Sequence, residues 1–324
     1  MEQATRMGLT AQASLAIEGA EWRVLACVNG AIYLRSNSAG LLWVSDREAA
    51  LHARAIEVGK LPPSGSATGT LCRLAHGILS IGDSLDIDLT NASIWEANWW
   101  PSLIARKSII PTDLHQALSQ VARIAPPQGG LAASLASLRN NRTGNGIETK
   151  ILSRARKAIR ECRRVSSWEM LPDVLDRCSG LIGLGSGLTP SGDDFLAAYL
   201  FTMKAYQIID GRDLGAVWRR IGKWLLSATA RTNVISSVLL LDCSIGEAAA
   251  PLGELVHSML RGAEIDELVF LAYKLSQIGH SSGWDMLVGV DAAISAIGRI
   301  KRTATEVKKV YRDAVCRKEA VHVG

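Results

Sequence analysis

The sequence predicts an α+β protein, with a small antiparallel β domain over residues 1–104 and a mainly helical domain over residues 105–324. Two observations support this prediction. From Trp22 onward, short runs alternate apolar residues with polar or small ones, which is the period of a half-buried strand. Near Pro101 this pattern ends, and apolar residues then recur at helical spacing.

The first domain contains short strand-like runs separated by turn signals. Residues 22–28 and 31–34 flank Asn29-Gly30, and this dipeptide strongly favours a two-residue hairpin turn. Further strands are expected over 41–44, 77–81 and 85–89, with a short helix over 46–57 and a loop over 61–66.

The second domain is predicted to consist of helices. One of them has an apolar stripe made of Ile151, Leu152, Ala155, Ile159 and Cys162. Its opposite side carries several basic residues, and such a face is more often solvated than bound to an anion. Those basic residues are Lys150, Arg154, Lys157 and Arg164. Further helices are expected over 192–208, 213–229, 247–261, 264–278, 283–297 and 303–318.

The overall composition is that of a globular protein with no strong preference for polyanions. Of the 324 residues, 48% are hydrophobic and 21% are charged, which allows a sizeable apolar core. The 36 basic and 31 acidic residues leave a formal net charge of +5, so anionic ligands are favoured only weakly. Glu306 and Asp313 interrupt the basic residues between Lys301 and Arg317, and nucleic-acid binding is therefore weakly supported.

The sequence favours a cytoplasmic location over secretion or membrane insertion. Residues 1–20 contain Glu2, Arg6 and Glu18 and no continuous apolar segment, so no signal peptide is expected there. No stretch approaches the ~18 uninterrupted apolar residues of a membrane span. The six cysteines form no CxxC pair and show neither zinc nor disulfide spacing, which predicts reduced thiols.

The most unusual feature is a glycine-rich turn that leads into an apolar helix. It reads Gly183-Leu-Gly185-Ser-Gly187-Leu-Thr189-Pro190-Ser191-Gly192-Asp193-Asp194. Alternating glycines leave the backbone bare, so main-chain N–H groups can approach a ligand closely. A helix with Ser191 as its N-cap would add free N–H groups and a positive dipole end. This combination favours a bound phosphate or carboxylate.

Helix capping is an alternative explanation for part of this turn. Ser191 and Asp194 form an S-x-x-D capping box, and Asp193 and Asp194 complement the helix dipole. Capping does not account for three glycines, a Thr-Pro pair and two adjacent aspartates in one turn. The spacing matches neither a Walker A loop nor the GxGxxG fingerprint, so those two nucleotide-binding motifs are excluded.

A second segment repeats the end of the glycine turn. Residues 282–287 share the pattern S-G-x-D-x-L with residues 191–196, and Asp285 aligns with Asp194. Both copies are expected to open an apolar helix. We therefore predict that the two helix starts face each other across one cleft lined by both aspartates. Chance repetition of a capping box is the alternative.

Arg231 and His280 are further candidates beside these turns. Arg231 and Thr232 lie among hydroxyl residues, which suits bidentate binding of an anion. A surface arginine at a helix junction is an equally good explanation. His280 precedes the second turn and can polarise a carbonyl or move a proton. The other histidines show no metal-ligand spacing, and no known nucleophile motif is present.

These segments together resemble the signature of the AllH-like proteins. The glycine turn over 183–194, the Arg231-Thr232 segment and the segment over 279–285 occur in the order of that family's motifs. The resemblance is specific over roughly 180–290 and looser over the β-rich part. Ala198 stands where the family pattern has a glycine after the Asp-Asp helix start.

The resemblance implies a subunit of oxamate carbamoyltransferase. This enzyme transfers a carbamoyl group between oxamate or oxalurate and phosphate or carbamoyl phosphate in allantoin (purine) catabolism. The resemblance also implies FdrA-like and AllG-like partner subunits, and it leaves the cofactor open. The S-T-R-T-R and H-P-x-Q stretches of ordinary carbamoyltransferases are absent, so a carbamoyl phosphate site here would be a different solution. A non-catalytic ligand-binding or scaffold subunit is the alternative.

The carbamoyltransferase interpretation assigns hypothetical roles to the residues of both turns. Asp194 and Asp285 orient the amide nucleophile or a metal-bound water, His280 polarises the carbonyl, and Asp193 is a further catalytic candidate. No set of metal ligands is predicted. The expected substrate- or phosphate-binding residues are Gly183, Gly185, Gly187, Thr189, Ser191, Gly192, Arg231, Thr232, Ser282 and Gly283.

Overall fold

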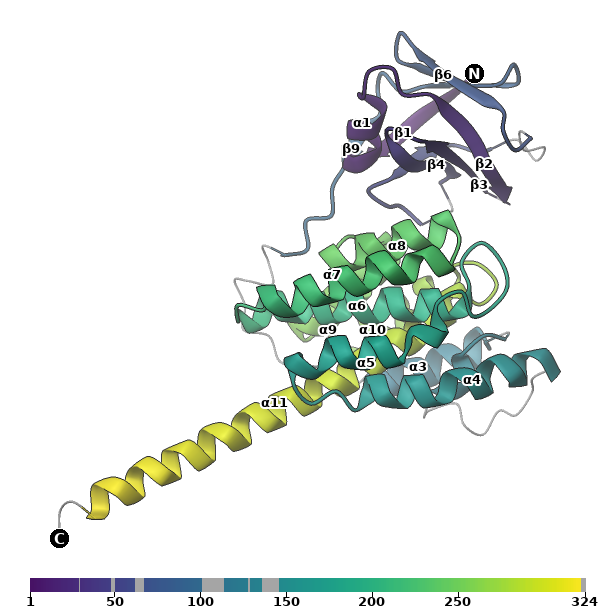
Figure 1. Cartoon of the computed structure of the whole chain (residues 1–324). Coiled ribbons are helices and arrows are strands. Elements are labelled where there is room, and N and C mark those ends of the chain that lie inside the picture. Colours follow the sequence, from purple (N-terminus) through teal and green to yellow (C-terminus); the bar gives the residue numbers. More distant parts are fainter. Residues whose placement is uncertain are drawn as a thin grey trace. The chain divides into compact units, whose positions relative to one another are not determined.

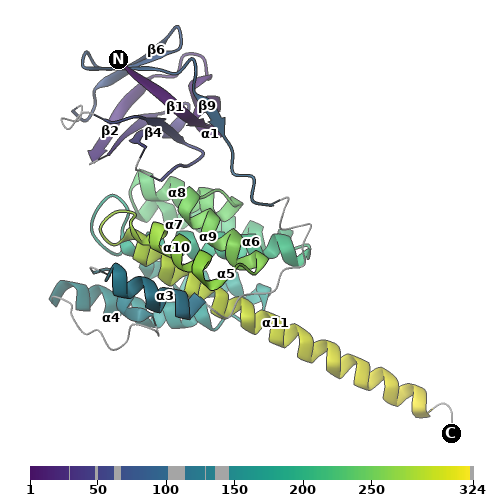
Figure 2. The ribbon, with the colours of Figure 1, turned by 180° about the vertical axis from the view of Figure 1, so that it is seen from behind.

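The chain splits into two compact units in this computed structural model (Figures 1 and 2). Unit 1 comprises Met1–Trp99 and Glu247–Glu254, and unit 2 comprises Trp100–Gly246 and Leu255–Gly324. The domain boundary expected at residues 104/105 lies outside the described residues. The structure describes residues 1–28, 30–47, 50–61, 67–100, 114–127, 129–135 and 146–321, without the side chains of 146–151 and 307–321.

Unit 1 is a closed β-barrel with one short helix of its own, and it also includes the first five residues of helix α9 (Ala250–Arg261), which continues into unit 2. The strand order is β5-β4-β3-β2-β6-β7-β8-β1-β9, and a pairing between β5 and β1 closes the sheet on itself (Figure 1). The elements are β1 (Glu2–Gly8), α1 (Leu9–Leu15), β2 (Trp22–Val28), β3 (Ala31–Ser36), β4 (Gly40–Asp46), β5 (Ala55–Val58), β6 (Leu71–Ala75), β7 (Ile78–Ile81), β8 (Leu85–Asp88) and β9 (Ser93–Trp95).

The structure confirms the predicted α+β class, but the sheet is mixed rather than purely antiparallel. The pairs β4–β5, β1–β8 and β1–β9 are parallel, while the β2–β3 hairpin and its neighbours are antiparallel. The helix expected over 46–57 is wrong, because Ala55–Val58 form β5. All four residues of this strand are buried, so the period-2 alternation that identifies a strand is missing there.

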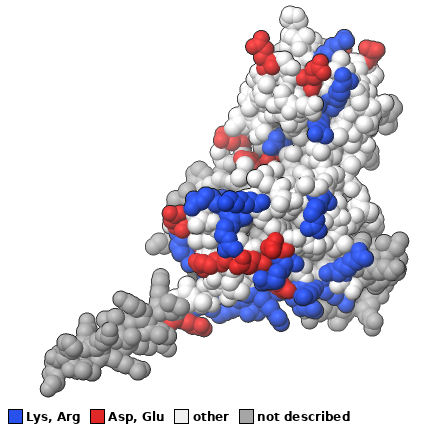
Figure 3. Space-filling view, in the orientation of Figure 1, with Lys and Arg blue, Asp and Glu red and all other residues white. Residues whose placement is uncertain are grey.

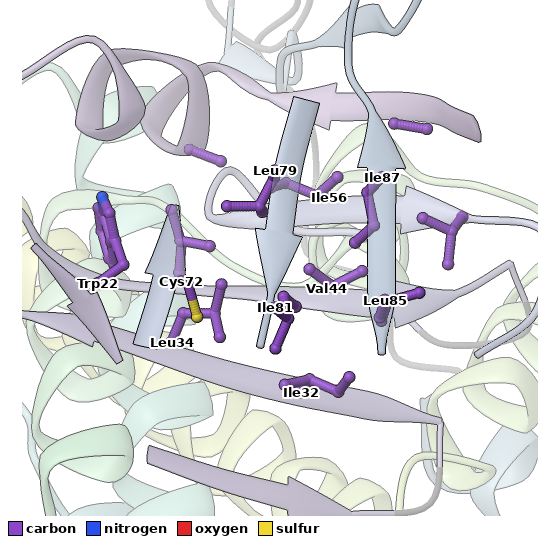
Figure 4. Packing of buried hydrophobic residues seen from close by; sticks show 14 of the residues in the cluster. Trp22, Ile32, Leu34, Val44, Ile56, Cys72, Leu79, Ile81, Leu85 and Ile87 are labelled. Atoms are coloured by element: carbon purple, nitrogen blue, oxygen red, sulfur yellow. The ribbon is translucent and has the colours of Figure 1, made fainter. Parts of the chain in front are cut away.

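Apolar side chains from all around the barrel fill its interior. Figure 4 shows Trp22, Leu34, Val44 and Ile56 among the residues of this buried cluster. One carboxyl is also buried, that of Glu57, which accepts hydrogen bonds from the Arg6 guanidinium and the Thr5 hydroxyl. Burial opposes its ionisation, but these hydrogen bonds outweigh burial and lower the Glu57 pKa.

Unit 2 is helical, and among the described residues no strand follows β9, as the sequence predicts. The helices expected over 283–297 and 303–318 are one continuous helix, because Gly298 between them lowers helix propensity without breaking the helix. The helices are α3 (Leu114–Ile124), η1 (Ala132–Ser134), α4 (Gly146–Arg163), η3 (Trp168–Met170), α5 (Leu171–Arg177), η4 (Ser179–Leu181), α6 (Ser191–Asp210), α7 (Gly215–Ala228), η5 (Thr229–Arg231), α8 (Val234–Ile245), α9 (Ala250–Arg261), α10 (Ile265–Ser276) and α11 (Ser282–Val321).

Helices α6 and α11 form the centre of unit 2. Almost every residue of α6 from Ser191 to Tyr206 is buried, and its main neighbours are α11 and α8. The backbones of α6 and α11 approach closely at Gly289, where a Cβ would lie 2.3 Å from Phe195 O and 3.0 Å from Ala198 Cβ. Ala198 and Gly289 occupy equivalent positions after the two S-G-x-D patterns. The crossing therefore joins the two repeated segments.

The stretch Val234–Arg261 is unusually apolar, with a mean hydropathy of 1.4 in its apolar window. By length and composition, Val234–Arg261 is apolar enough to cross a membrane, and 39% of its apolar window is buried. The secondary structure divides this stretch into α8 and α9, each of 12 residues, at Gly246 with φ +98°. A membrane span needs about 20 residues, so this stretch is weak evidence for one.

Candidate functional site

The glycine turn connects η4 to α6 and requires glycine at three positions. Gly183, Gly185 and Gly187 have φ of +71°, +128° and +95°, a region that L side chains rarely adopt. A Cβ on Gly183 would lie 2.9 Å from Arg231 O, and one on Gly185 would lie 2.6 Å from Ser191 N. Gly187 instead faces open space, with nothing within 4 Å of its Cβ position. Gly183 and Gly185 thus allow the turn to pack closely against neighbouring backbone, and Gly187 leaves the space beside the turn open.

The start of α6 corrects the predicted capping box. The N-cap is Pro190 rather than Ser191, and no side chain caps this helix end. Asp193 N and Asp194 N donate to Pro190 O at 2.9 and 3.1 Å, and Gly192 N donates to Leu184 O at 2.8 Å. Since the turn itself occupies the Gly192 N–H, this group is not available to a ligand. Proline at the N-cap has no hydroxyl, so backbone groups satisfy the helix end.

The turn nevertheless displays a set of unpaired donors. The backbone N–H groups of residues 185–189 and of Ser191 have no acceptor among the described residues. Ser186 and Gly187 are exposed, and Thr189 is half-buried. Successive N–H groups in a turn of this kind form a concave site of positive potential. The donors therefore come from the turn rather than from the helix end.

Asp193 fastens the turn to the following helices. It is 2% exposed; its Oδ1 accepts from Gly183 N at 2.8 Å, and its Oδ2 accepts from Thr232 Oγ1 at 2.5 Å. Burial raises the Asp193 pKa, while hydrogen bonds from Thr232, Gly183 and Ser236 act in the opposite direction. Both carboxyl oxygens are occupied within the protein, so the arrangement gives Asp193 a structural role in the turn.

Asn233 holds the other half of the turn. Its side chain caps α8 by accepting a hydrogen bond from Ser236 N at 3.0 Å. The same amide donates through Nδ2 to Leu188 O at 2.8 Å. The sequence places Asn233 beside Arg231, but only the fold shows that it supports the turn.

Asp285 is the buried carboxyl of the second turn. It is fully buried, and it accepts hydrogen bonds from Leu131 N at 2.6 Å and from Ser281 Oγ at 3.0 Å. Burial raises its pKa to about 7, although hydrogen bonds from Leu131, Ser191 and Ser281 counteract this rise. Gly129 and Gly130 predict a turn from the sequence. No feature of the sequence around them indicates that the backbone amide of the next residue, Leu131, donates to Asp285.

The two S-G-x-D segments are in contact, as their repetition predicts, but Asp194 and Asp285 are buried and do not line an open cleft. Thr189 Oγ1 and Ser282 Oγ lie 2.9 Å apart. Ser282 of the second copy is a hydrogen-bond partner of Asp194 in the first copy, and Ser191 of the first copy is a hydrogen-bond partner of Asp285 in the second. The two copies meet in a buried polar cluster, which we call the carboxyl cluster and which consists of Asp193, Asp194 and Asp285 with Thr189, Ser191, Ser281 and Ser282.

The glycines of the two S-G-x-D segments also have equivalent environments. A Cβ on Gly192 would lie 2.0 Å from Leu181 O, and one on Gly283 would lie 1.9 Å from Leu275 O. Both glycines therefore allow a helix start to pack against the end of a preceding element. The pattern S-G-x-D has the same packing reason in each copy, and neither glycine presents a free surface to a ligand.

Asp194 is the least satisfied member of the carboxyl cluster. It is 3% exposed, and its Oδ2 atom has no hydrogen-bond partner among the described residues. Burial raises its pKa well above the usual value; hydrogen bonding to Ser282 and Thr189 opposes this rise, and the charges of Asp285 and Asp193 add to it. Burial therefore favours the neutral form of this carboxyl, because the charged form would lose its hydration.

Arg231 and His280 are the exposed candidates. The Arg231 carbonyl packs against Gly183, and its guanidinium makes no ion pair or hydrogen bond within the part of the chain that the structure describes. His280 is exposed one residue before Ser281, and no hydrogen bond or ion pair joins its ring to the described residues of the carboxyl cluster. On the face of unit 2 in Figure 3, basic and acidic side chains are interspersed. Arg231 is thus a cation beside the turn without an ion-pair partner in the described ranges.

The carboxyl cluster does not resemble a metal centre. Among the described residues, no group of three or more His, Cys, Asp or Glu side chains could hold a metal ion. The oxygens of Asp193 are bound to an N–H group and a hydroxyl, so they are not directed at a common point. The donor set favours hydrogen-bond chemistry over metal chemistry.

The fold and site define a two-unit α+β protein whose helical unit carries a glycine turn on paired S-G-x-D helix starts. Residues 181–294 match the family model described as "Oxamate carbamoyltransferase subunit AllH". This match includes both turns and confirms the AllH-like resemblance over this segment. No curated protein and no solved structure gives a significant match.

Proposed function

We propose that this chain is a subunit of an oxamate carbamoyltransferase-like enzyme in the cytoplasm. The reaction transfers a carbamoyl group between oxamate or oxalurate and phosphate or carbamoyl phosphate, in allantoin-linked purine catabolism. The observation that carries this proposal is the family match over 181–294, which contains both turns of the carboxyl cluster. The family name describes a subunit, so we propose FdrA-like and AllG-like subunits as partners in a complex.

The anionic groups of the substrates fit the donors of the glycine turn. The N–H groups of residues 185–189 and the Arg231 guanidinium have no partner in the described part of the chain, so they can provide hydrogen bonds and positive charge for a phosphate or carboxylate. Two aspartates close by would repel an anion if both were exposed and charged. Here Asp193 is bound internally, and Asp194 is buried with a raised pKa that favours its neutral form, which reduces this repulsion.

The experiment that tests the proposal is a carbamoyl-transfer assay. The purified chain is mixed with carbamoyl phosphate and oxamate, with and without FdrA-like and AllG-like subunits, and oxalurate and phosphate are measured. We expect oxalurate only where this chain is present. Oxalurate formation that is unchanged when this chain is omitted would contradict a catalytic contribution.

A second candidate function is a ligand-binding or scaffold subunit without catalysis. The burial of Asp193, Asp194 and Asp285 favours it, since each is at most 3% exposed and therefore closed to a substrate in this structure. Titration of phosphate and carbamoyl phosphate by calorimetry separates the candidates when combined with the assay. Binding without any effect on turnover supports the scaffold role, whereas binding with loss of turnover in an Arg231→Ala variant supports catalysis.

A further inference from the structure

Two hydroxyl groups join the buried carboxyls to the exposed turn. Thr189 Oγ1 and Ser282 Oγ share a hydrogen bond of 2.9 Å in which either can be the donor. Both residues are half-buried, and both are hydrogen-bond partners of Asp194. Asp194 is 3% exposed, and its Oδ2 atom has no partner among the described residues. A chain of exchangeable protons thus runs from a buried acid to the turn.

We propose that Thr189 and Ser282 form a proton path between buried Asp194 and a ligand bound at the glycine turn. The role of this path in catalysis rests on the proposed carbamoyl transfer. Proton transfer along Thr189, Ser282 and Asp194 does not depend on that reaction and can be tested without substrate. Hydroxyl groups both donate and accept hydrogen bonds, so each can pass on one proton as it receives another.

The hydrogen bonds indicate which carboxyl holds the proton. Asp285 accepts from Leu131 N and Ser281 Oγ, and these donors stabilise its charged form. Asp194 has no such backbone donor among the described residues, and burial together with the nearby charges of Asp285 and Asp193 raises its pKa well above the usual value. Asp285 and Asp193 are the ionisable groups that act on it. Since Asp285 has these two donors for its charged form, a proton shared by the two carboxyls is favoured on Asp194.

The chemistry of carbamoyl transfer needs such an acid. When phosphate attacks the carbamoyl carbon of oxalurate, a C–O bond forms and the bond from this carbon to the amide nitrogen breaks. The nitrogen leaves with the electron pair and takes a proton from Thr189, which is replaced from Ser282 and finally from Asp194. Hydrogen phosphate loses its proton in the same reaction, and this proton restores Asp194. In the opposite direction the path carries the proton away from oxamate.

Hydrogen–deuterium exchange of the Asp194 carboxyl tests the path on the full chain without substrate. Infrared spectroscopy resolves the C=O band of a protonated carboxyl, and Asp194→Asn identifies the band by removing it. After transfer to D₂O, we expect Thr189→Val and Ser282→Ala to exchange at least ~10-fold more slowly than the wild type, because neither new side chain can relay a proton. Thr189→Ser and Ser282→Thr keep a hydroxyl and should exchange at the wild-type rate.

Two outcomes would overturn the proton path: a missing Asp194 band, or equal exchange rates in all variants. Circular dichroism checks folding, and Thr189→Ala replaces Thr189→Val if the latter does not fold. In an active assembly, the same two blocking variants should lower kcat about 100-fold, with rescue by the hydroxyl-retaining variants. Slow exchange in the blocking variants together with no carbamoyl transfer by the wild type would confirm the path and contradict the proposed reaction.

Discussion

The backbone amide of Leu131 donates a hydrogen bond of 2.6 Å to Asp285 Oδ1, although the two residues are 154 positions apart in the sequence. Gly130, with φ +61°, makes this approach possible, because a Cβ on it would lie 2.3 Å from the same oxygen. Asp285 also accepts from Ser281 Oγ at the start of α11. The buried Asp285 carboxyl therefore joins the 129–135 segment to the carboxyl cluster through its hydrogen bond with Leu131.

This arrangement predicts a pH-dependent contribution of Asp285 to stability. Its pKa is raised from 3.8 to about 7 in the folded protein, so between these values the folded state binds more protons than the unfolded state. The contribution of Asp285 to the free energy of unfolding is therefore fully present below about pH 4, where the carboxyl is protonated in both states. It is lost as the pH rises to about 7, because the buried carboxyl then has to ionise. At 1.36 kcal/mol per pH unit, the full loss is about 4 kcal/mol. Asp285→Asn should remove this dependence.

Urea unfolding at pH 5 and pH 8 provides the measurement. The wild type should lose more stability than Asp285→Asn between these two pH values, because carboxyls with lowered pKa values elsewhere are common to both proteins and cancel in the comparison. Parallel profiles for the two proteins would show that Asp285 is already ionised at pH 5 in the folded state.

Local patterns in the sequence predict the hairpins of unit 1 but not the closure of its barrel. The run over 22–28 alternates and is followed by a turn dipeptide, so its pairing partner is adjacent in the chain. Strand β1 instead pairs with β5, β8 and β9, all of them distant in sequence. Such pairings depend on tertiary packing, and period-2 alternation gives neither the partner nor its direction.

In the candidate site, too, the sequence predicts some features and the fold determines others. The glycine spacing and the repeated S-G-x-D pattern predict that two turns come together, and the 2.9 Å contact between Thr189 and Ser282 shows that they do. The N-cap at Pro190 and the supports from Leu131 and Asn233 were not predicted. Each of these three features depends on a backbone N–H or C=O group whose position is set by the fold. Every residue has such groups, so the pattern of side chains in the sequence does not show which of them are used.

The crossing of α6 and α11 predicts a specific stability effect at Gly289. Gly289→Ala should destabilise the protein by about 1–3 kcal/mol or more, because its Cβ would lie 2.3 Å from Phe195 O. Gly222 in α7 is the matched control, since nothing lies within 4 Å of its Cβ position. Gly222→Ala should stabilise by about 0.5–1 kcal/mol through helix propensity. Thermal and urea unfolding would measure both, and equal effects would contradict the close approach.

Thr232 is predicted to stabilise the turn through Asp193. Its hydroxyl donates to Asp193 Oδ2 at 2.5 Å, and removal of this donor leaves the hydrogen bonds from Gly183 and Ser236 to satisfy a buried carboxyl. Thr232→Val should therefore cost about 1–3 kcal/mol of unfolding free energy, measured by urea unfolding. Thr232→Ser keeps the hydroxyl and should cost much less. A similar loss in both variants would show that the methyl group, rather than the hydrogen bond, matters at this position.

The glycine turn is predicted to bind phosphate and carbamoyl phosphate. The donors are the N–H groups of residues 185–189, which have no acceptor among the residues that the structure describes, and Arg231 adds charge. Arg231→Ala should weaken binding by ~1.5–3 kcal/mol, the usual worth of a charged hydrogen bond, and the affinity should fall as salt concentration rises. Gly187→Val should abolish binding, because its side chain would fill the open space in front of the turn.

Two matched variants make this last prediction specific. Gly211 also has a positive φ (+67°) and open space at its Cβ position, so Gly211→Val introduces comparable backbone strain at the end of α6. Arg220 is exposed but paired with Asp173, so Arg220→Ala removes a cation that does not belong to the turn. Calorimetric titration should give wild-type affinity for both controls. If Gly211→Val also loses binding, strain rather than blocked access explains the effect of Gly187→Val, and the turn would not be the anion site.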